Sequence, residues 1–200
     1  MTDRGRLGNQ LSVRFAPVRR LRAKPESGTV PSSFSALYDE HFDFVWRSLR
    51  RLGVPEAALD DAAQEVFLVV HRRLSEFEGR SSLKTWLFGI AFNVAQHFVR
   101  ANARRGTDRI LDLPVPDVAT PQEELLQAEA VRLLYRVLDE LHPDKRSVFV
   151  MAELEHMTAP EIVEATGLPL NTVYSRLRLA RRDFEAALKR HKARDDWRSG

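Results

Sequence analysis

The chain has 200 residues, of which 44% are apolar and 30% are charged, a balance that fits a folded helical protein and argues against global disorder. It contains no cysteine, which excludes disulfides, thiolate metal sites and cysteine nucleophiles. No apolar run approaches the roughly eighteen residues of a membrane-spanning helix, and the first residues lack the apolar segment of a secretory signal. We therefore expect a cytoplasmic protein with no membrane insertion.

The formal net charge is only +3, but the charges are unevenly distributed. Residues 1–33 carry seven Arg or Lys against two acids, and residues 172–194 carry eight against two. Residues 108–129 carry six acids and a single arginine. Separated basic and acidic blocks indicate a surface for a polyanion and an acidic tether. Ordinary solvated helix faces are the alternative explanation, and it stays open at this point.

The order of patterns along the chain predicts two helical modules. Residues 1–31 lack apolar periodicity and are rich in Arg, Gly and Pro, which predicts a disordered basic arm that could touch nucleic acid. Strand-like alternation is absent, so the fold class is all-α. We expect an arm at 1–31, a helical module at 32–104, a flexible proline-containing linker at 105–121, a second helical module at 122–192 and a tail at 193–200.

The first module reads as a compact bundle of three helices with short connections. Apolar residues recur at steps of three and four over residues 34–52, 56–77 and 81–105. Gly53 and Gly79 interrupt these helices, and Pro55 suits the first turn of the second. Ser81 or Ser82 is expected to cap the third helix.

The outward face of the second helix is acidic with an apolar centre. This face is expected to carry Asp61, Gln64, Glu65, Leu68 and Arg72. Because phosphates would be repelled by such a face, it suits a protein partner. Two alternatives stay open, namely a solvated face with one stray leucine and a carboxylate nuclease site at Asp60, Asp61 and Glu65. The nuclease site would lack both a base and a phosphate-cradling loop.

The third helix presents a different face, opposite its expected buried stripe of Leu87, Ile90, Ala91, Val94 and Phe98. The face contains Trp86, Gly89, Asn93, Gln96 and Arg100. An aromatic ring, an amide and a cation together suit unstacked bases, and the flanking basic residues would add phosphate-binding charge. Alternatively, Trp86 fills the core.

The second module ends in a helix-turn-helix pattern. Helices are expected at residues 122–141 and 143–155, before the motif begins. Thr158 and Glu161 fit a capping box, and Gly167 suits the left-handed end of that short helix. Asn171 is expected to cap the last helix. A glycine turn between two short helices is typical of the helix-turn-helix, although ordinary helical hairpins share it.

The last helix has an apolar back and a basic front. Its packing stripe is Val173, Leu177, Ala180, Phe184 and Leu188. Opposite lie Ser175, Arg178 and Arg182, flanked by Tyr174, Leu179 and Arg176. Hydroxyls and guanidiniums on an exposed face are what a helix in the DNA major groove needs. Burying these polar side chains unpaired would be costly, which argues against a plain core hairpin.

Metal and enzyme chemistry find little support in the sequence. The six histidines show no HExxH or other close pairing. We therefore expect no metal, no cofactor, no catalytic residue and no small-molecule substrate.

Three stretches in this order resemble the extracytoplasmic-function (group 4) branch of the sigma-70 family of polymerase sigma factors. "DDAAQEVFLVVHRRLSEFEG" is similar to the family's region 2.2, and the TWL and IAFN motifs of the third helix are similar to regions 2.3 and 2.4. The segment from "LDELHPDKRSVFV" to "SRLRLARRDFEAAL" is similar to region 4. The resemblance covers residues 34–188, and it implies a region 2 bundle joined by the linker to a region 4 helix-turn-helix.

The resemblance also implies partners for particular residues. Asp61, Gln64, Glu65, Phe67 and Leu68 would bind the β′ clamp helices of core RNA polymerase, with the β flap as a further polymerase contact. The minus-10 DNA would be contacted by Gly79, Arg80, Ser81, Ser82 and Asn93, joined by Trp86, Gln96 and Arg100 from the same helix. The minus-35 DNA would be contacted by Thr172, Ser175, Arg176, Arg178 and Arg181, with Asn171, Tyr174 and Arg182 beside them.

On this basis we expect a sigma factor without catalytic chemistry of its own, which guides polymerase to promoter DNA and which an anti-sigma factor can sequester. Three departures from the family pattern affect the expected minus-35 sequence rather than the fold. They are "APEIVEAT" in place of "SPEEIA", Leu141-His142-Pro143 in place of the usual LP, and Tyr174 in place of a small or basic residue. The alternative is a helix-turn-helix transcriptional regulator that is not a polymerase subunit.

Overall fold

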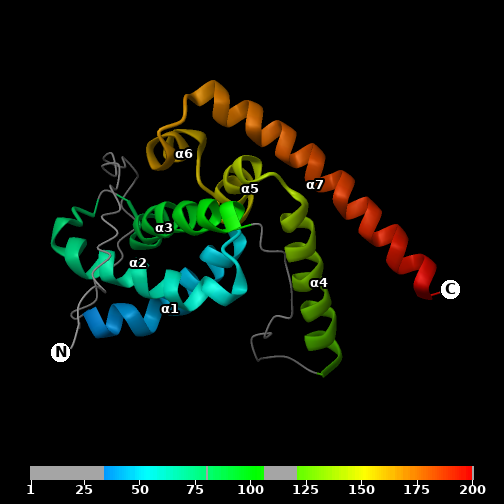
Figure 1. Ribbon diagram of the computed structural model, residues 1–200, viewed down its shortest axis with the longest axis horizontal. Coiled ribbons are helices and arrows are strands. Elements are labelled where there is room, and N and C mark those ends of the chain that lie inside the picture. The colour runs from blue at the N-terminus through cyan, green and yellow to red at the C-terminus, as the bar shows by residue number, and fades with distance from the viewer. Residues whose placement is uncertain (1–33, 80, 106–120, 200) are drawn as a thin grey trace, which may run out of the picture.

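The computed structural model describes residues 34–79, 81–105 and 121–199, and these residues form helices without any strand (Figure 1). The all-α prediction is confirmed. The predicted basic arm, Arg80 and residues 106–120 of the predicted linker lie outside the described residues. Within the described part of the chain, no helix combines the length and the hydropathy needed to cross a membrane.

The N-terminal module consists of three mutually packed helices, α1 (Phe34–Arg51), α2 (Leu59–Arg73) and α3 (Leu83–Arg105). The helix α3 lies at its centre, because its first three turns are buried on almost every side. Its buried side chains include Trp86, Leu87, Phe88, Ile90, Ala91, Phe92, Val94 and Ala95. A helix that is apolar all round is stable only when neighbours surround it, and α1 and α2 supply those neighbours.

The ends of these helices follow local chemistry. Gly53 has a φ of +98°, and its N–H donates to Arg50 while the N–H of Val54 donates to Leu49, which is the Schellman ending that glycine favours. Ser82 caps α3, since its hydroxyl accepts from the N–H of Thr85 at 3.1 Å. The second helix is shorter than predicted, because 3-10 turns occupy Glu56–Ala58 and Leu74–Glu76 at its two ends.

The C-terminal module contains α4 (Pro121–Glu140), α5 (Pro143–Phe149), α6 (Ala159–Thr166) and the long α7 (Leu170–Ser199). The chain after α5 widens into a π turn at Val150–Leu154 instead of continuing as the α-helix predicted to residue 155. Phe184 of α7 stacks on Phe149 with ring centroids 4.5 Å apart. The expected stripe on α7 is confirmed, with Val173, Leu177 and Ala180 buried and Phe184 and Leu188 half-buried.

The helix-turn-helix has the predicted turn and a different cap. The carboxylate of Glu161 accepts from the N–H of Thr158 at 2.7 Å, as a capping box requires, and Gly167 ends α6 with a φ of +71°. The prediction that Asn171 caps α7 is wrong. The carbonyl of Pro169 accepts from the N–H of Val173 at 3.1 Å, so α7 begins at Leu170 and Asn171 lies exposed in its first turn.

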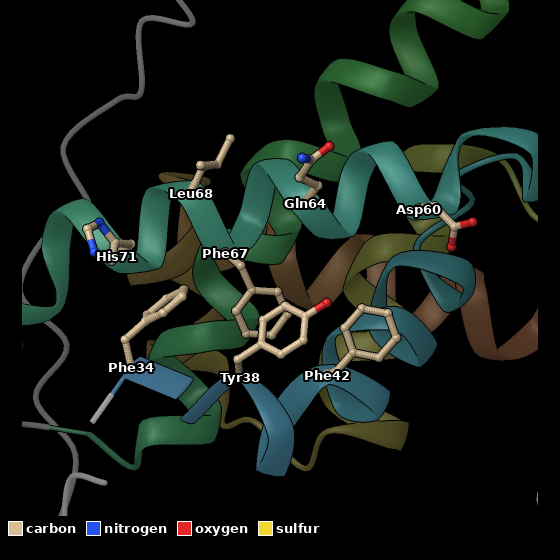
Figure 2. Close-up of a pocket in the computed structure, with 8 residues that line it drawn as sticks. All are labelled: Phe34, Tyr38, Phe42, Asp60, Gln64, Phe67, Leu68 and His71. Atoms are coloured by element: carbon tan, nitrogen blue, oxygen red, sulfur yellow. The ribbon is translucent and has the colours of Figure 1, made fainter. Parts of the chain in front are cut away.

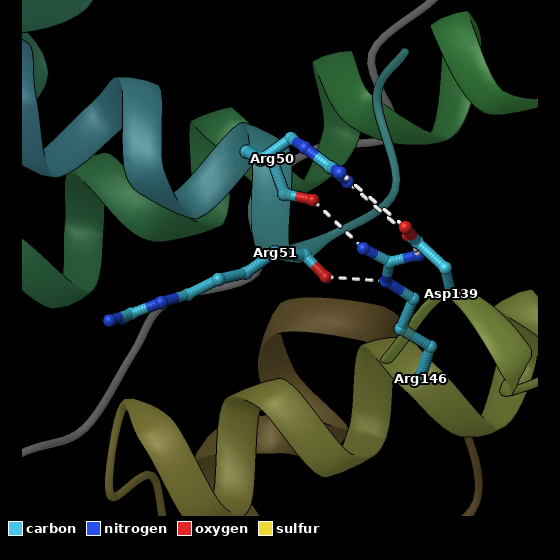
Figure 3. Close-up of polar contacts among 4 residues, drawn as sticks. All are labelled: Arg50, Arg51, Asp139 and Arg146. Carbon is cyan, nitrogen blue, oxygen red and sulfur yellow. Dashed lines mark hydrogen bonds and ion pairs between the residues drawn. The ribbon is translucent and has the colours of Figure 1, made fainter. Parts of the chain in front are cut away.

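The two modules share one continuous apolar core. Buried side chains run without interruption from α1, α2 and α3 through Leu141, Val148 and Phe149 into α7. The carboxyl end of α1 lies against α4 and α5 at this junction, where polar contacts join the modules (Figure 3). In this structure, apolar packing and polar contacts together hold the modules in one relative placement.

Candidate functional site

A groove of about 680 Å³ opens between α1 and α2. It is lined by Phe34, Tyr38, Phe42, Asp60, Gln64, Phe67, Leu68 and His71 (Figure 2). Aromatic rings from both helices form its floor, with the centroids of Tyr38 and Phe67 only 4.6 Å apart. Two of its side chains, Tyr38 and Leu68, are exposed large hydrophobic residues. Such a groove offers apolar area to a macromolecular partner.

The structure separates two neighbours that were assigned together to polymerase binding. Leu68 is 50% exposed, whereas Phe67 is 3% exposed. Figure 2 shows Phe67 pointing toward Tyr38 and Phe42 of α1, and Leu68 pointing away from them. Phe67 therefore belongs to the floor of the groove rather than to the outward face, because adjacent helical positions point about 100° apart.

The acidic residues expected beside Leu68 do face outward. Asp61 and Gln64 are exposed, and Glu65 is half-buried. Together with Asp60 at the groove, they place carboxylates next to the apolar floor. This chemistry would repel a phosphate backbone and would suit a protein surface that carries basic and apolar side chains.

The expected exposed face of α3 is only partly exposed. Trp86 is 8% exposed and packs against Phe77 at a centroid distance of 5.3 Å, so the alternative that Trp86 fills the core is confirmed and its placement on an exposed surface is wrong. Gly89, one turn later, is also buried. The amphipathic pattern misled at these positions because α3 is enclosed by α1, α2 and the turn after α2, which leaves little of its first half accessible.

The exposed part of this face begins further along α3. Asn93 and Gln96 are half-buried, and Arg100 is exposed. The amide nitrogen of Asn93 donates to the carbonyl of Gly89 at 2.9 Å, which fixes the orientation of this half-buried amide. A preoriented amide of this kind can bond the edge of an unstacked base.

The loop before α3 contributes a glycine and two hydroxyls. Gly79 is exposed with a φ of +65°, Ser82 is half-buried at the cap of α3, and Ser81 is buried at 5% exposure. The hydroxyl of Ser81 donates to the carbonyl of Ser82 at 3.3 Å. Since Ser81 bonds to Ser82 and Ser82 bonds to Thr85 in the first turn of α3, the first role of both serines is to shape the loop and its junction with α3.

The front of α7 is polar and exposed, as the sequence predicts. Tyr174 is 55% exposed, and Asn171, Ser175, Arg178, Arg181 and Arg182 are also exposed, while Thr172 and Arg176 are half-buried. The hydroxyl of Ser175 donates to the carbonyl of Thr172 at 3.0 Å. The side chains of this face could reach base edges and phosphates of duplex DNA.

Ion pairs divide the arginines of α7 into two groups. Arg176 pairs with Asp144 at 3.0 Å, Arg181 with Glu153 at 2.6 Å, and Arg182 with Asp183 at 2.9 Å. Asp183 also accepts from Lys145, and the hydrogen bonds of Lys145 and Arg182 lower the pKa of this carboxyl. Within the described residues no ion pair involves Arg178. Exposed ion pairs of this type are weak, so these three arginines can exchange their acidic partners for a DNA phosphate. Arg178 has no such ion pair to break among the described residues.

The alternative of a metal-dependent nuclease has no support in the geometry. In the part of the chain that the structure describes, no three His, Asp or Glu side chains gather closely enough to hold a metal ion.

Sequence analysis missed the contribution of α1 to the groove. Phe34, Tyr38 and Phe42 recur every four residues, and they form a stripe distinct from the buried Leu37, Val45 and Leu49. Two adjacent apolar stripes on one helix are the signal that it faces both a core and a second surface.

Comparison with known proteins identifies these modules. The family model described as "Sigma-70 region 2" matches residues 37–105, and "Sigma-70, region 4" matches residues 132–184. The chain belongs to the sigma-70 family. Within the family, this sigma factor is similar to members of the extracytoplasmic-function (ECF) branch. It is 30% identical over 137 residues to the ECF RNA polymerase sigma-E factor of Haemophilus influenzae, covering 64% of this chain and 72% of that protein.

A second relative agrees with this placement, and two solved structures share the fold. The ECF RNA polymerase sigma-E factor of Escherichia coli K12 is 29% identical over 138 residues, which are 64% of this chain and 72% of that protein. The solved structure of a sigma factor, RpoE from Bartonella quintana, in complex with the anti-sigma factor NepR matches with a TM-score of 0.60 at 19% identity, over 78% of this chain and 96% of that one. CnrH in complex with the cytosolic domain of CnrY matches with a TM-score of 0.53 at 24% identity, over 78% and 87%.

The family match places the described faces within named regions. The groove, the acidic face of α2 and the α3 face lie in region 2, and the front of α7 lies in region 4. This sigma factor therefore has the two regions through which sigma factors direct RNA polymerase in transcription initiation, and the prediction of its family and general function is confirmed.

Proposed function

We propose that this sigma factor guides core RNA polymerase to promoters by dividing three tasks among three faces. The acidic and apolar face of α2 binds polymerase, the α3 face holds melted minus-10 DNA, and the front of α7 holds minus-35 duplex. The observation that carries this proposal is the difference in chemistry between the faces. One is acidic with exposed Leu68, one presents the amide of Asn93, and one presents Arg178 without an intramolecular ion-pair partner among the described residues.

The polymerase-binding face combines an anchor with a charged surround. Leu68 can bury its exposed half in a partner, and Asp61, Gln64 and Glu65 can pair with basic or amide side chains around it. In the family this surface meets the β′ clamp helices. The adjoining aromatic groove would accept a further apolar side chain from the same partner.

The DNA-binding faces suit two states of the nucleic acid. Extruding a base costs a few kcal/mol, and stacking and hydrogen bonding at about 1 to 3 kcal/mol per base can offset that cost. Asn93, Gln96 and Arg100 supply amides and a charge for the melted strand. Tyr174, Ser175 and Arg178 supply a ring, a hydroxyl and a guanidinium for the duplex.

Under this proposal the chain performs no catalysis, because the polymerase supplies the chemistry of RNA synthesis. Its place of action is the cytoplasm, where the polymerase transcribes. An anti-sigma factor is a further expected partner, since a structural relative was solved with NepR, which is named as one.

Reconstitution with bacterial core polymerase tests this function. Full-length chain is mixed with core enzyme and a library of promoter fragments, and run-off transcripts are mapped. The expected result is a 1:1 complex and transcripts that start at defined sites only when the chain is present. The rival, a helix-turn-helix regulator outside the polymerase, predicts sequence-specific DNA binding by the chain alone and no complex with core enzyme. That outcome would overturn the proposal.

A further inference from the structure

The side chain of Arg146 crosses the boundary between the two modules. It extends from α5 and is 6% exposed, and its guanidinium reaches the carboxyl end of α1 (Figure 3). Its Nε donates to the carbonyl of Arg51 at 2.6 Å, and its Nη2 donates to the carbonyl of Arg50 at 2.9 Å. Its Nη1 donates to Asp139 on α4 at 2.7 Å. Arg146 therefore joins three helices with one side chain.

The end of α1 is well suited to receive a guanidinium. The last carbonyls of a helix lack intrahelical partners and carry partial negative charge. The Schellman turn at Gly53 satisfies Leu49 and Arg50 from the backbone, and Arg146 adds the charged donor for Arg50 and Arg51. A Cβ at Gly53 would lie 3.4 Å from the guanidinium, which is an ordinary contact distance, so glycine is favoured there by its φ of +98° and not by crowding from Arg146.

Further contacts between the modules surround Arg146. Arg50 of α1 pairs with Asp139 at 3.2 Å and lies over the ring of Tyr135 at 4.9 Å. Arg51 pairs with Glu155 at 2.9 Å. Burial raises the pKa of the Asp139 carboxyl, but the charges and hydrogen bonds of Arg146 and Arg50 outweigh burial and hold this pKa below its ordinary value. Asp139 thus stays ionised and bonded to arginines from both modules.

We propose that Arg146 is a latch that holds region 4 closed against the end of α1, and that releasing it lets the modules separate. Residues 106–120 stand between α3 and α4 in the sequence, and a connection of this length allows the modules to separate. A helix that reads duplex and a face that holds melted strand act on different stretches of DNA. While region 4 is held against α1 (the closed chain), the two DNA-binding faces have one fixed relative placement. Once the modules separate (the open chain), each face can bind its own stretch of DNA.

The latch can be tested in the free protein, without polymerase or DNA. Because the chain has no cysteine, Asp43→Cys on α1 and Lys189→Cys on α7 give a donor and acceptor pair at two exposed positions. Energy transfer is measured in the otherwise unchanged chain, in Arg146→Gln and in the control Arg132→Gln, which removes an exposed arginine of α4. Circular dichroism verifies that each variant stays helical.

We expect Arg146→Gln to shift the equilibrium toward the open chain by about tenfold or more, as loss of charged hydrogen bonds would, and so to lower energy transfer. Arg132→Gln should leave transfer unchanged. Equal energy transfer in Arg146→Gln and in the unchanged chain, with both helical, would overturn the latch.

If Arg146→Gln loses its helical signal, energy transfer is measured instead in the double variant Asp139→Asn, Glu155→Gln. Lower transfer in this variant supports the latch, and unchanged transfer overturns it. Because no polymerase is present, failure of the latch leaves the proposed function standing, and the reverse also holds.

Discussion

Tyr38 of α1 and Phe67 of α2 lie with ring centroids 4.6 Å apart, and this contact places Phe67 in the floor of the groove while Leu68 faces outward. The two neighbours should therefore respond differently to truncation. Phe67→Ala should lower the free energy of unfolding by about 3 to 5 kcal/mol, because it leaves a cavity in the core. Leu68→Ala should change stability by less than about 1 kcal/mol and weaken binding to core polymerase.

Thermal unfolding and co-purification with core enzyme check this pair. Leu68→Glu is a stronger version of the second change, because it adds charge where apolar contact is expected. A Leu68 variant that binds core polymerase as tightly as the unchanged chain would contradict the assignment.

Trp86 should act on stability before it acts on DNA. The ring is buried beside Phe77, so Trp86→Ala should cost about 3 to 5 kcal/mol of stability. Trp86→Phe keeps much of the apolar volume and should retain both fold and promoter-directed transcription. Chemical denaturation of both variants gives the stabilities, and normal stability of Trp86→Ala would be inconsistent with its place in the core.

Asn93→Ala should reduce initiation while leaving polymerase binding intact. The amide is half-buried and held by the carbonyl of Gly89, so its removal costs little packing and deletes a candidate base contact. Loss of one such contact corresponds to about 1 to 3 kcal/mol, or roughly five- to 150-fold in the population of melted complex. Abortive transcription and permanganate footprinting on a mapped promoter measure the effect. Unchanged initiation would show that another residue reads the base.

Arg178 and Arg181 make a matched pair on α7. Arg178→Ala should weaken binding to minus-35 duplex and lower the slope of log affinity against log salt by about one if the side chain contacts phosphate. Arg181→Ala should have a smaller effect, because Glu153 already pairs with that guanidinium at 2.6 Å. Fluorescence anisotropy over a range of salt concentrations distinguishes them. A larger effect for Arg181 would mean that its ion pair opens on DNA.

The contact between the modules should persist well into acid. The folded-state pKa of Asp139 is lowered, so its stabilising contribution is complete above the ordinary carboxyl pKa of about 3.9 and is lost as pH falls through the folded value. Energy transfer between labels at positions 43 and 189 should stay constant from pH 7 to about pH 4 and fall below it. Asp139→Asn should remove the part of that acid transition that belongs to Asp139. If energy transfer has already fallen completely at pH 5, the transition belongs to a group other than Asp139.

The helices and their ends could be predicted because they depend on neighbours in the sequence. The capping box at Thr158 and Glu161, the left-handed Gly167 and the serine cap of α3 involve residues at most four positions apart, and each is present in the structure. The outward positions of Asp61, Gln64 and Leu68 likewise follow from helical periodicity alone. The family was predicted from the resemblance of three motif stretches, in their order along the chain, to the sigma-70 family, and the family models confirm it.

Tertiary structure decided what lies beside each helix. Periodicity gives one buried stripe per helix, but α3 is enclosed on several sides, so Trp86 is buried. Phe67 is covered by rings from another helix, and Arg176 and Arg181 find acids 32 and 28 positions away. The contact of Arg146 with Arg51 spans 95 positions. A single sequence states which residues can make such contacts, whereas only the packing of whole helices brings a particular donor to a particular acceptor.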